Sequence, residues 1–222
     1  MGRAYEVRKA SIQKTGAAKA KLYSNFAKEI YLAAKKGVPE VDSNIDLKRM
    51  VEKAKGAGGE DYSTVVYEGF GPGASTLIIK TLTDNVNRTV SFVREAFNKV
   101  HKSLGVTNSV SYNYDYLAVM SFKSDKEEEV FESLLNEGIE PVEFECEEGY
   151  ITISVNPTDH NKVKDVVENL IPDVDYEVDE VGMYAKDKVT LTGEDLELFN
   201  RLYSMLEDID DVTDIYHNVN LD

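Results

Sequence analysis

The strongest constraint on this chain is an abrupt change of composition at residues 55–59, Lys-Gly-Ala-Gly-Gly. Residues 1–55 hold 13 basic and 6 acidic residues, a net charge of +7, whereas the remaining chain holds 12 basic and 35 acidic residues, a net charge of −23. A glycine-rich stretch between regions of opposite charge is typical of a boundary between separately folded parts. We therefore expect a basic segment, residues 1–55, joined to an acidic body.

The basic segment has apolar residues at helical spacing in two stretches, one before Gly37 and one after Ser43. The two apolar stripes consist of Leu22, Phe26, Ile30, Ala33, Leu47, Met50, Val51 and Ala54. Two helices with so little apolar surface are marginally stable alone. We expect them either to lean on the body or to lack a partner helix in this sequence.

The acidic body alternates strand-like and helix-like periods, with a hairpin predicted at Gly71–Gly73. Strands or extended segments are expected at 64–70, 75–82, 109–114, 117–122, 142–146, 150–155, 176–184, 188–191 and 213–219, and helices from 84 or 85 to about 100, 126–136, 159–171 and 194–206. Strand pairs that alternate with single helices predict an α+β fold, with antiparallel sheets that carry helices on one face. The body is too long for one such unit, so we expect two, with boundaries near Ser124 and Lys186.

No pattern in the body predicts catalysis or a bound cofactor. The glycines at 69–73 lie between two strands, whereas a phosphate-binding loop precedes a helix. The acidic runs lack the spacing of a calcium loop, and the three histidines lack a second ligand nearby. Cys146 alternates with Val142 and Phe144, so we expect it to face inward and to be inert. We therefore predict no catalytic residue, no metal and no cofactor.

The basic residues are the candidate binding site, because lysine and arginine bind phosphate. Helix exteriors are often rich in lysine, but such faces normally contain acids as well, and residues 7–28 contain none. The predicted nucleic-acid-binding residues are Arg3, Arg8, Lys9, Lys14, Lys19, Lys21, Lys28, Lys35, Lys36, Lys48, Arg49 and Lys53. Phosphate contacts position a protein without reading sequence.

Four motifs carry a resemblance to a known family. They are YEGFGPG at 67–73, LTDNVNRTVSFVREAF at 82–97, NSVSY at 108–112 and LEDIDDVTDIYHNVNLD at 206–222. Together they resemble the YebC/PmpR family over nearly the whole chain. The resemblance implies a basic N-terminal helical domain (1–59), an α+β domain (60–124 with 186–222) and a second α+β domain (125–185) inserted in it. It supplies no catalytic residues.

The resemblance implies a cytoplasmic protein that regulates gene expression. Family members are described as DNA-binding transcriptional regulators, and some relatives, including the mitochondrial translational activator of cytochrome oxidase, act on translation, with relief of ribosome stalling at proline runs attributed to the family. The chain departs from the family in two places. Its opening MGRAYEVRKASIQKTG lacks the usual tryptophan, and Lys55 runs directly into Gly56 where members have a further helical segment, which we expect to be omitted from the sequence.

Three functions are compared with these sequence features. The first is a DNA-binding transcriptional regulator, although no base-reading helix can be named. The second is a ribosome-associated translation factor that binds rRNA or tRNA, for which phosphate and shape contacts suffice. The third is a metal-dependent hydrolase with an acidic cleft, for which no ligand set is visible. We predict a non-enzymatic nucleic-acid-binding regulator without a membrane segment.

Overall fold

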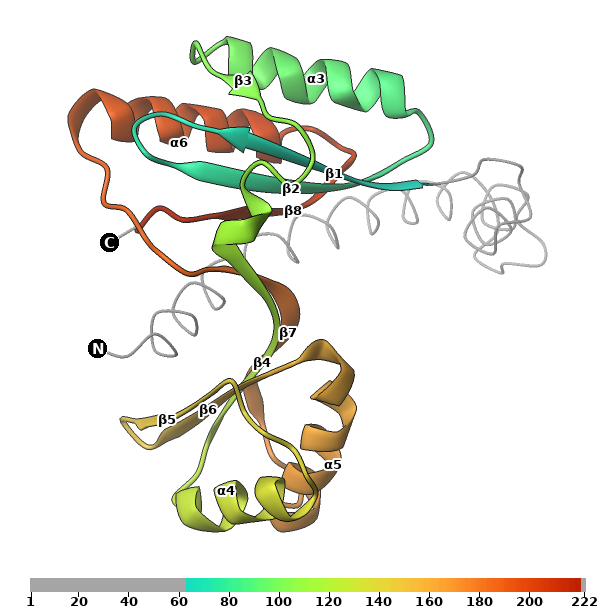
Figure 1. Cartoon of the computed structure of the whole chain (residues 1–222), viewed down its shortest axis with the longest axis vertical. Coiled ribbons are helices and arrows are strands. Elements are labelled where there is room, and N and C mark those ends of the chain that lie inside the picture. Colours follow the sequence, from blue (N-terminus) through green and yellow to red (C-terminus); the bar gives the residue numbers. More distant parts are fainter. Residues whose placement is uncertain (1–62, 221–222) are drawn as a thin grey trace, which may run out of the picture.

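The computed structural model describes residues 63–220, which form two four-stranded antiparallel sheets, each covered by two helices on one face (Figure 1). The predicted α+β class is confirmed. The helices predicted in the basic segment lie outside the described residues.

The first sheet has the strand order β3-β1-β2-β8, and helices α3 and α6 pack on one of its faces (Figure 1). Its core lies between β2 and the two helices, where Leu77, Ile79, Phe97, Phe199 and Leu202 are fully buried. The elements are β1 (Ser63–Phe70), β2 (Thr76–Thr83), α3 (Val86–Asn98), β3 (Ser103–Leu104), α6 (Gly193–Glu207) and β8 (Val212–His217).

The turn between β1 and β2 confirms the predicted hairpin. Gly73 adopts a φ of +59°, which glycine reaches without steric cost, and the backbone N–H of Gly71 donates to the Ser75 carbonyl at 2.8 Å. Helix α3 begins at its predicted cap, because the side chain of Asn85 accepts from the Arg88 N–H at 3.0 Å. Val86 is exposed, however, so the buried stripe starts one turn later than its apolar spacing predicts.

The second sheet has the order β5-β6-β4-β7, and helices α4 and α5 cover one face of it (Figure 1). Its core joins Met120, Phe122 and Ile153 of the sheet to Val130 and Val163 of the helices. The elements are β4 (Tyr114–Lys123), α4 (Glu127–Asn136), β5 (Glu143–Glu147), β6 (Tyr150–Val155), α5 (His160–Leu170) and β7 (Tyr176–Ala185).

Helix α4 buries a narrower stripe than its sequence predicts. Val130 and Leu134 are fully buried, whereas Phe131 and Leu135 are exposed. The helix ends at Asn136, and the glycine predicted to stop it, Gly138, follows with a φ of +71°. A helix on one side of a sheet needs only one fully buried row of apolar residues. The neighbouring row is partly exposed, and the ring of Phe131 still contacts that of Phe144, with the ring centroids 5.0 Å apart.

The strand predicted at residues 109–114 is wrong. The chain forms the short strand β3, a turn and a 3-10 helix, η1 (Ser111–Asn113), before β4 starts at Tyr114. The cause is the carboxylate of Glu68, which accepts the backbone N–H groups of Val110 and Ser111 at 2.8 and 2.9 Å. Those donors are therefore not available to a neighbouring strand.

The second sheet interrupts the first one in the chain. All elements from β4 to β7 come between β3 and α6, and α6 and β8 then return to the first sheet. The paired strands β4 and β7 run between the two halves of the described structure (Figure 1). The domain boundaries at residues 59, 124 and 186 stay a prediction.

Candidate functional site

All twelve residues predicted to bind nucleic acid fall between Arg3 and Lys53, which lies outside the described residues. Their arrangement therefore stays a prediction. A competing site for phosphate, metal or substrate would have to lie within residues 63–220.

Residues 63–220 offer little positive surface. They contain 12 basic and 32 acidic residues, a net charge of −20. At least six of the twelve basic side chains already pair with carboxylates: Lys80, Arg88, Lys99, Lys162, Lys164 and Lys186. A surface of this sign repels phosphate. Nucleic-acid backbone contact is therefore not favoured in this part of the chain.

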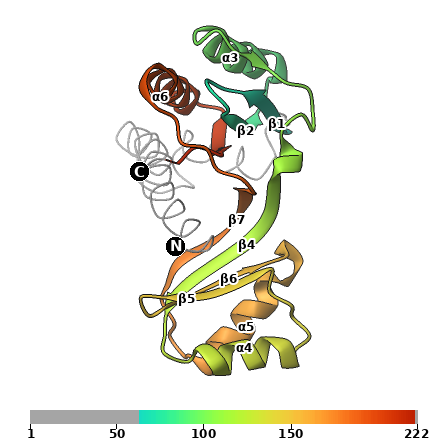
Figure 2. The same cartoon turned by 60° about the vertical axis from the view of Figure 1, so that its left-hand side comes forward.

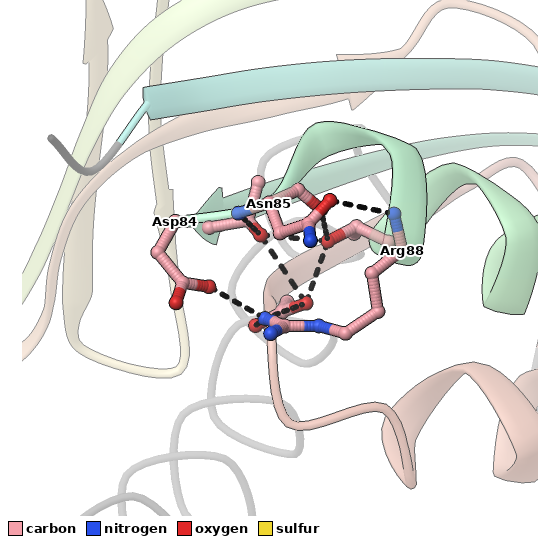
Figure 3. A network of polar contacts seen from close by, with 6 residues as sticks. Asp84, Asn85 and Arg88 are labelled. Carbon is pink, nitrogen blue, oxygen red and sulfur yellow. Dashed lines mark hydrogen bonds and ion pairs between the residues drawn. The ribbon is translucent and has the colours of Figure 1, made fainter. Parts of the chain in front are cut away.

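A network of polar contacts lies where α3 begins (Figure 3). The Arg88 guanidinium donates from Nη2 to Asp84 Oδ1 at 2.7 Å and to both carboxylate oxygens of Asp211 at 3.0 and 3.1 Å. Asp211 also accepts from the hydroxyls of Thr89 at 2.6 Å and Thr83 at 3.3 Å. The hydrogen bonds to Asp211 and then to Asp84 raise the pKa of Arg88. The network ties α3 to the turn before β8, and Nη2 of Arg88 makes all of these contacts.

A hollow of about 740 Å³ lies between α3 and the connection from α6 to β8. Its apolar lining includes Phe92, Met205 and Ile209. Acidic side chains outnumber basic ones in its lining, with Asp84, Glu95, Asp208, Asp210 and Asp211 against Arg88 and Lys99. A metal-dependent hydrolase would need an acidic cleft of this kind. Yet within residues 63–220 no three His, Cys, Asp or Glu side chains are placed to hold a metal.

The single cysteine lies on the predicted side of its strand but is not buried. Cys146 is opposite Ile151 of β6 and therefore points to the helix-covered side of the sheet, yet it stays exposed on the edge strand β5. Partial desolvation, and then the hydrogen bond and charge of Glu127, raise the pKa of the thiol. A raised pKa disfavours the reactive thiolate. Low reactivity is therefore still expected, because of the raised pKa of the thiol and not because the side chain is buried.

Glu68 is a buried carboxylate that sequence reasoning did not single out. It accepts from the backbone N–H groups of Asn108, Val110 and Ser111 at 2.8 to 2.9 Å. Burial raises its pKa, but the three donors outweigh burial and lower the pKa overall. All its oxygen contacts are used in holding the loop before β4, so its role is structural.

Comparison with known proteins decides the family. The family described as "TACO1/YebC second and third domain" matches residues 62–219, and "TACO1/YebC protein N-terminal domain" matches residues 3–59. The chain belongs to the TACO1/YebC family. The resemblance inferred from the four sequence motifs is confirmed.

Similar TACO1/YebC proteins are known from bacteria. A "Probable transcriptional regulatory protein" of Pseudoalteromonas atlantica is 40% identical over 98% of this chain and 97% of its own length. Another of that name, VPA0011 of Vibrio parahaemolyticus, is 40% identical and covers 100% of both chains. The alignment with the Vibrio protein runs over 238 positions although this chain has 222 residues, so at least 16 positions have no counterpart here.

A solved structure shares the fold. The crystal structure of a conserved hypothetical protein, Aq1575 from Aquifex aeolicus, matches 94% of this chain and 93% of its own with 28% identity and a TM-score of 0.60. None of the helices in residues 63–220 has the length and apolarity needed to cross a membrane.

Proposed function

We propose that the chain is a non-enzymatic, cytoplasmic regulator of gene expression that binds nucleic acid through the basic segment, residues 1–55. The observation that carries the proposal is the separation of charge. The basic segment has a net charge of +7, and the described body has −20 with at least half of its basic side chains paired to acids. Phosphate is attracted to the first and repelled by the second.

Duplex DNA is the target that the names of the relatives favour, since two relatives of 40% identity are called probable transcriptional regulatory proteins. In this function the twelve basic residues between Arg3 and Lys53 contact the backbone phosphates. Sequence preference then requires base contacts as well, and two of the described helices are poor candidates for them because their first turns are acidic. The first turn of α4 contains Glu127, Glu128 and Glu129, and the first turn of α6 contains Glu194 and Asp195.

Ribosomal or transfer RNA is the second target, and the same acidity of α4 and α6 favours it. A translation factor needs to recognise the shape and phosphates of folded RNA, and it needs no recognition helix in a major groove. The acidic body would then limit non-specific adhesion to other RNA, because it repels phosphate.

A charge-reversal experiment tests the proposal. The triple variant Lys21→Glu/Lys28→Glu/Lys35→Glu changes the net charge by six in the basic segment. Its matched control, Arg94→Glu/Lys162→Glu/Arg201→Glu, makes the same change at exposed positions of α3, α5 and α6. Binding of the wild type and both variants is measured over a salt series, with promoter DNA in one arm and ribosomes in the other.

We expect the basic-segment variant to bind more weakly, and the slope of log K against log salt to fall by about 3, or about 1 for each lost phosphate contact. The control should bind almost as the wild type does. Tight binding retained in the basic-segment variant would defeat the proposal. Ribosome co-sedimentation without sequence-preferring DNA binding would select the RNA target.

A further inference from the structure

A row of apolar side chains remains exposed where α4 lies beside the edge strand β5. Phe131 and Leu135 of α4 are 38% and 47% exposed, and Val142, just before β5, is 54% exposed. The half-buried ring of Phe144 joins them, because its centroid lies 5.0 Å from that of Phe131. We call these four residues the α4–β5 patch. Figure 2 shows α4 at the end of the described structure away from the first sheet.

Helix α4 and strand β5 are aligned so that the patch is continuous. Two contacts fix the alignment, because Glu127 hydrogen-bonds Cys146 and the Phe131 ring meets that of Phe144. Four residues of an α-helix rise about 6.0 Å, and two residues of a strand rise about 6.6 Å. The next step, four residues forward on α4 and two residues back along β5, therefore brings the other two members of the patch level with each other.

The surroundings of the patch are strongly acidic. Residues 125–148 contain 11 acidic residues and one basic residue, a net charge of −10, which is half of the −20 carried by residues 63–220. The basic residue, Lys126, is turned to α5, because its Nζ donates to the carbonyl of Leu170 at 3.0 Å. On α4, the exposed side chains of Glu128 and Glu132 flank the apolar row. The patch is therefore an apolar surface surrounded by negative charge.

Charged side chains on an edge strand prevent its pairing with other chains, and this role accounts for the glutamates of β5. It does not account for the apolar row beside them, because large apolar side chains left in water do not protect an edge. A contiguous apolar surface with a polar rim is typical of a docking site. The negative charge repels nucleic acid and anionic membranes, so both properties together fit a basic protein segment.

We propose that the α4–β5 patch docks a basic, amphipathic segment of another protein, with apolar side chains over Phe131 and Leu135 and basic side chains toward Glu132. Proteins that bind nucleic acid carry such basic segments. Under the proposed function, the patch then connects the chain to a second protein on the same nucleic acid. The docking itself does not depend on that function, since it needs only α4 and β5.

Fluorescence anisotropy with defined peptides tests the docking on the full chain. The probe is a labelled peptide of about 14 leucine and lysine residues, long enough to form a helix, with the leucines on one face. One control peptide has glutamate in place of lysine, and another has serine in place of leucine. We expect only the leucine–lysine peptide to bind, and to bind more weakly at about 0.5 M salt than at about 0.05 M, because salt screens the ion pairs.

A first pair of variants tests the apolar contact. Leu135→Ser/Val142→Ser should weaken binding of the leucine–lysine peptide at least about tenfold, because apolar anchors at the centre of a contact carry most of its affinity. The matched control, Val66→Ser/Val106→Ser, replaces valines that are 50% and 78% exposed elsewhere, and it should bind as the wild type does.

A second pair tests the charge. Glu128→Lys/Glu132→Lys should weaken binding at least about fivefold, because like charges then face the lysines of the peptide. Asp187→Lys/Glu197→Lys makes the same charge change at exposed positions before and within α6. This control should change binding less than about twofold at 0.15 M salt, where charges farther apart than about 8 Å are largely screened.

The proposal is overturned if the leucine–lysine peptide does not bind, or if Leu135→Ser/Val142→Ser binds it as the wild type does. Equal binding of the glutamate peptide would overturn it too, because the partner would then not be basic. Sedimentation velocity covers the remaining occupant. A dimer of the wild type that Leu135→Ser/Val142→Ser dissociates would assign the patch to a second copy of this chain and would also overturn the proposal.

Discussion

Replacing Glu68 by Gln should destabilise the protein through the loop that this side chain holds. Oε2 accepts from the backbone N–H groups of Val110 and Ser111 at 2.8 and 2.9 Å, and Oε1 accepts from Asn108 at 2.8 Å. Glutamine keeps one oxygen but brings an NH2 group in place of the other. If the NH2 group takes the place of Oε2, the N–H groups of Val110 and Ser111 face a donor; if it takes the place of Oε1, the N–H group of Asn108 does.

The size of the effect follows from these contacts. A hydrogen bond to a charged group contributes about 1.5–3 kcal/mol, and a buried donor left without an acceptor costs about 1–3 kcal/mol. Glu68 and Val110 are buried, whereas Asn108 and Ser111 can reach water, so the loss is smaller than three full bonds. We expect the free energy of unfolding to fall by about 3 kcal/mol, which lowers Tm by roughly 6–12 °C in a chain of this size.

Acidification provides a second readout. Because the pKa of Glu68 is lower in the folded state than its ordinary value of 4.5, the carboxylate adds stability above that value. This contribution is lost as the pH falls through the folded-state pKa. Glutamine has no such contribution to lose, so the Tm difference between wild type and variant should shrink below pH 4.5.

Thermal unfolding followed by circular dichroism at pH 7 and at lower pH measures both effects. Glu132→Gln, at an exposed position of α4, is the matched control and should leave Tm nearly unchanged. A Tm drop of less than about 2 °C for Glu68→Gln at pH 7, or a difference that persists in acid, would refute the reasoning.

Two further changes test the packing of α3 and the chemistry of Cys146. Gly69→Ala would place a Cβ 2.5 Å from Cε1 of the fully buried Phe97, so we expect a loss of about 1–3 kcal/mol in urea unfolding, and a neutral result would contradict this packing. Glu127→Gln removes a charge that, after desolvation, raises the pKa of Cys146, so maleimide labelling at pH 7.5 should become a few-fold faster, and an unchanged rate would show that Glu127 does not act on the thiol.

Local sequence signals predicted the elements whose cause is local. The hairpin at Gly71–Gly73 and the start of α3 at Asn85 depend on backbone and side-chain preferences within a few residues, and the structure contains both. The strand predicted at 109–114 failed because its donors bind Glu68, about 40 residues earlier in the chain. No periodicity within a short window can register such a distant acceptor.

The sequence predicted the nucleic-acid-binding site only as an excess of basic residues in 1–55. Counting charges separates residues 1–55 from the body, but it does not reveal that Arg88 is held by Asp84 and Asp211, because Asp211 lies 123 residues away. The sequence of β4 likewise did not show which of its faces is buried. Its neighbours Val119 and Met120 point to opposite faces but are both apolar, and both are fully buried. Which faces are covered depends on elements that are far apart in sequence.

The interruption of the first sheet by the second affects the order of folding during synthesis. Strand β8 pairs with β2 over a separation as long as that from Leu77 to His217, whereas β4 and β7 pair over separations from Phe122–Tyr176 to Tyr114–Ala185. A nascent chain therefore exposes every strand of the second sheet before β8 leaves the ribosome. The second sheet can therefore close first, although β1 and β2 are made before it, and these two strands wait for their last neighbour, β8, until translation is almost complete.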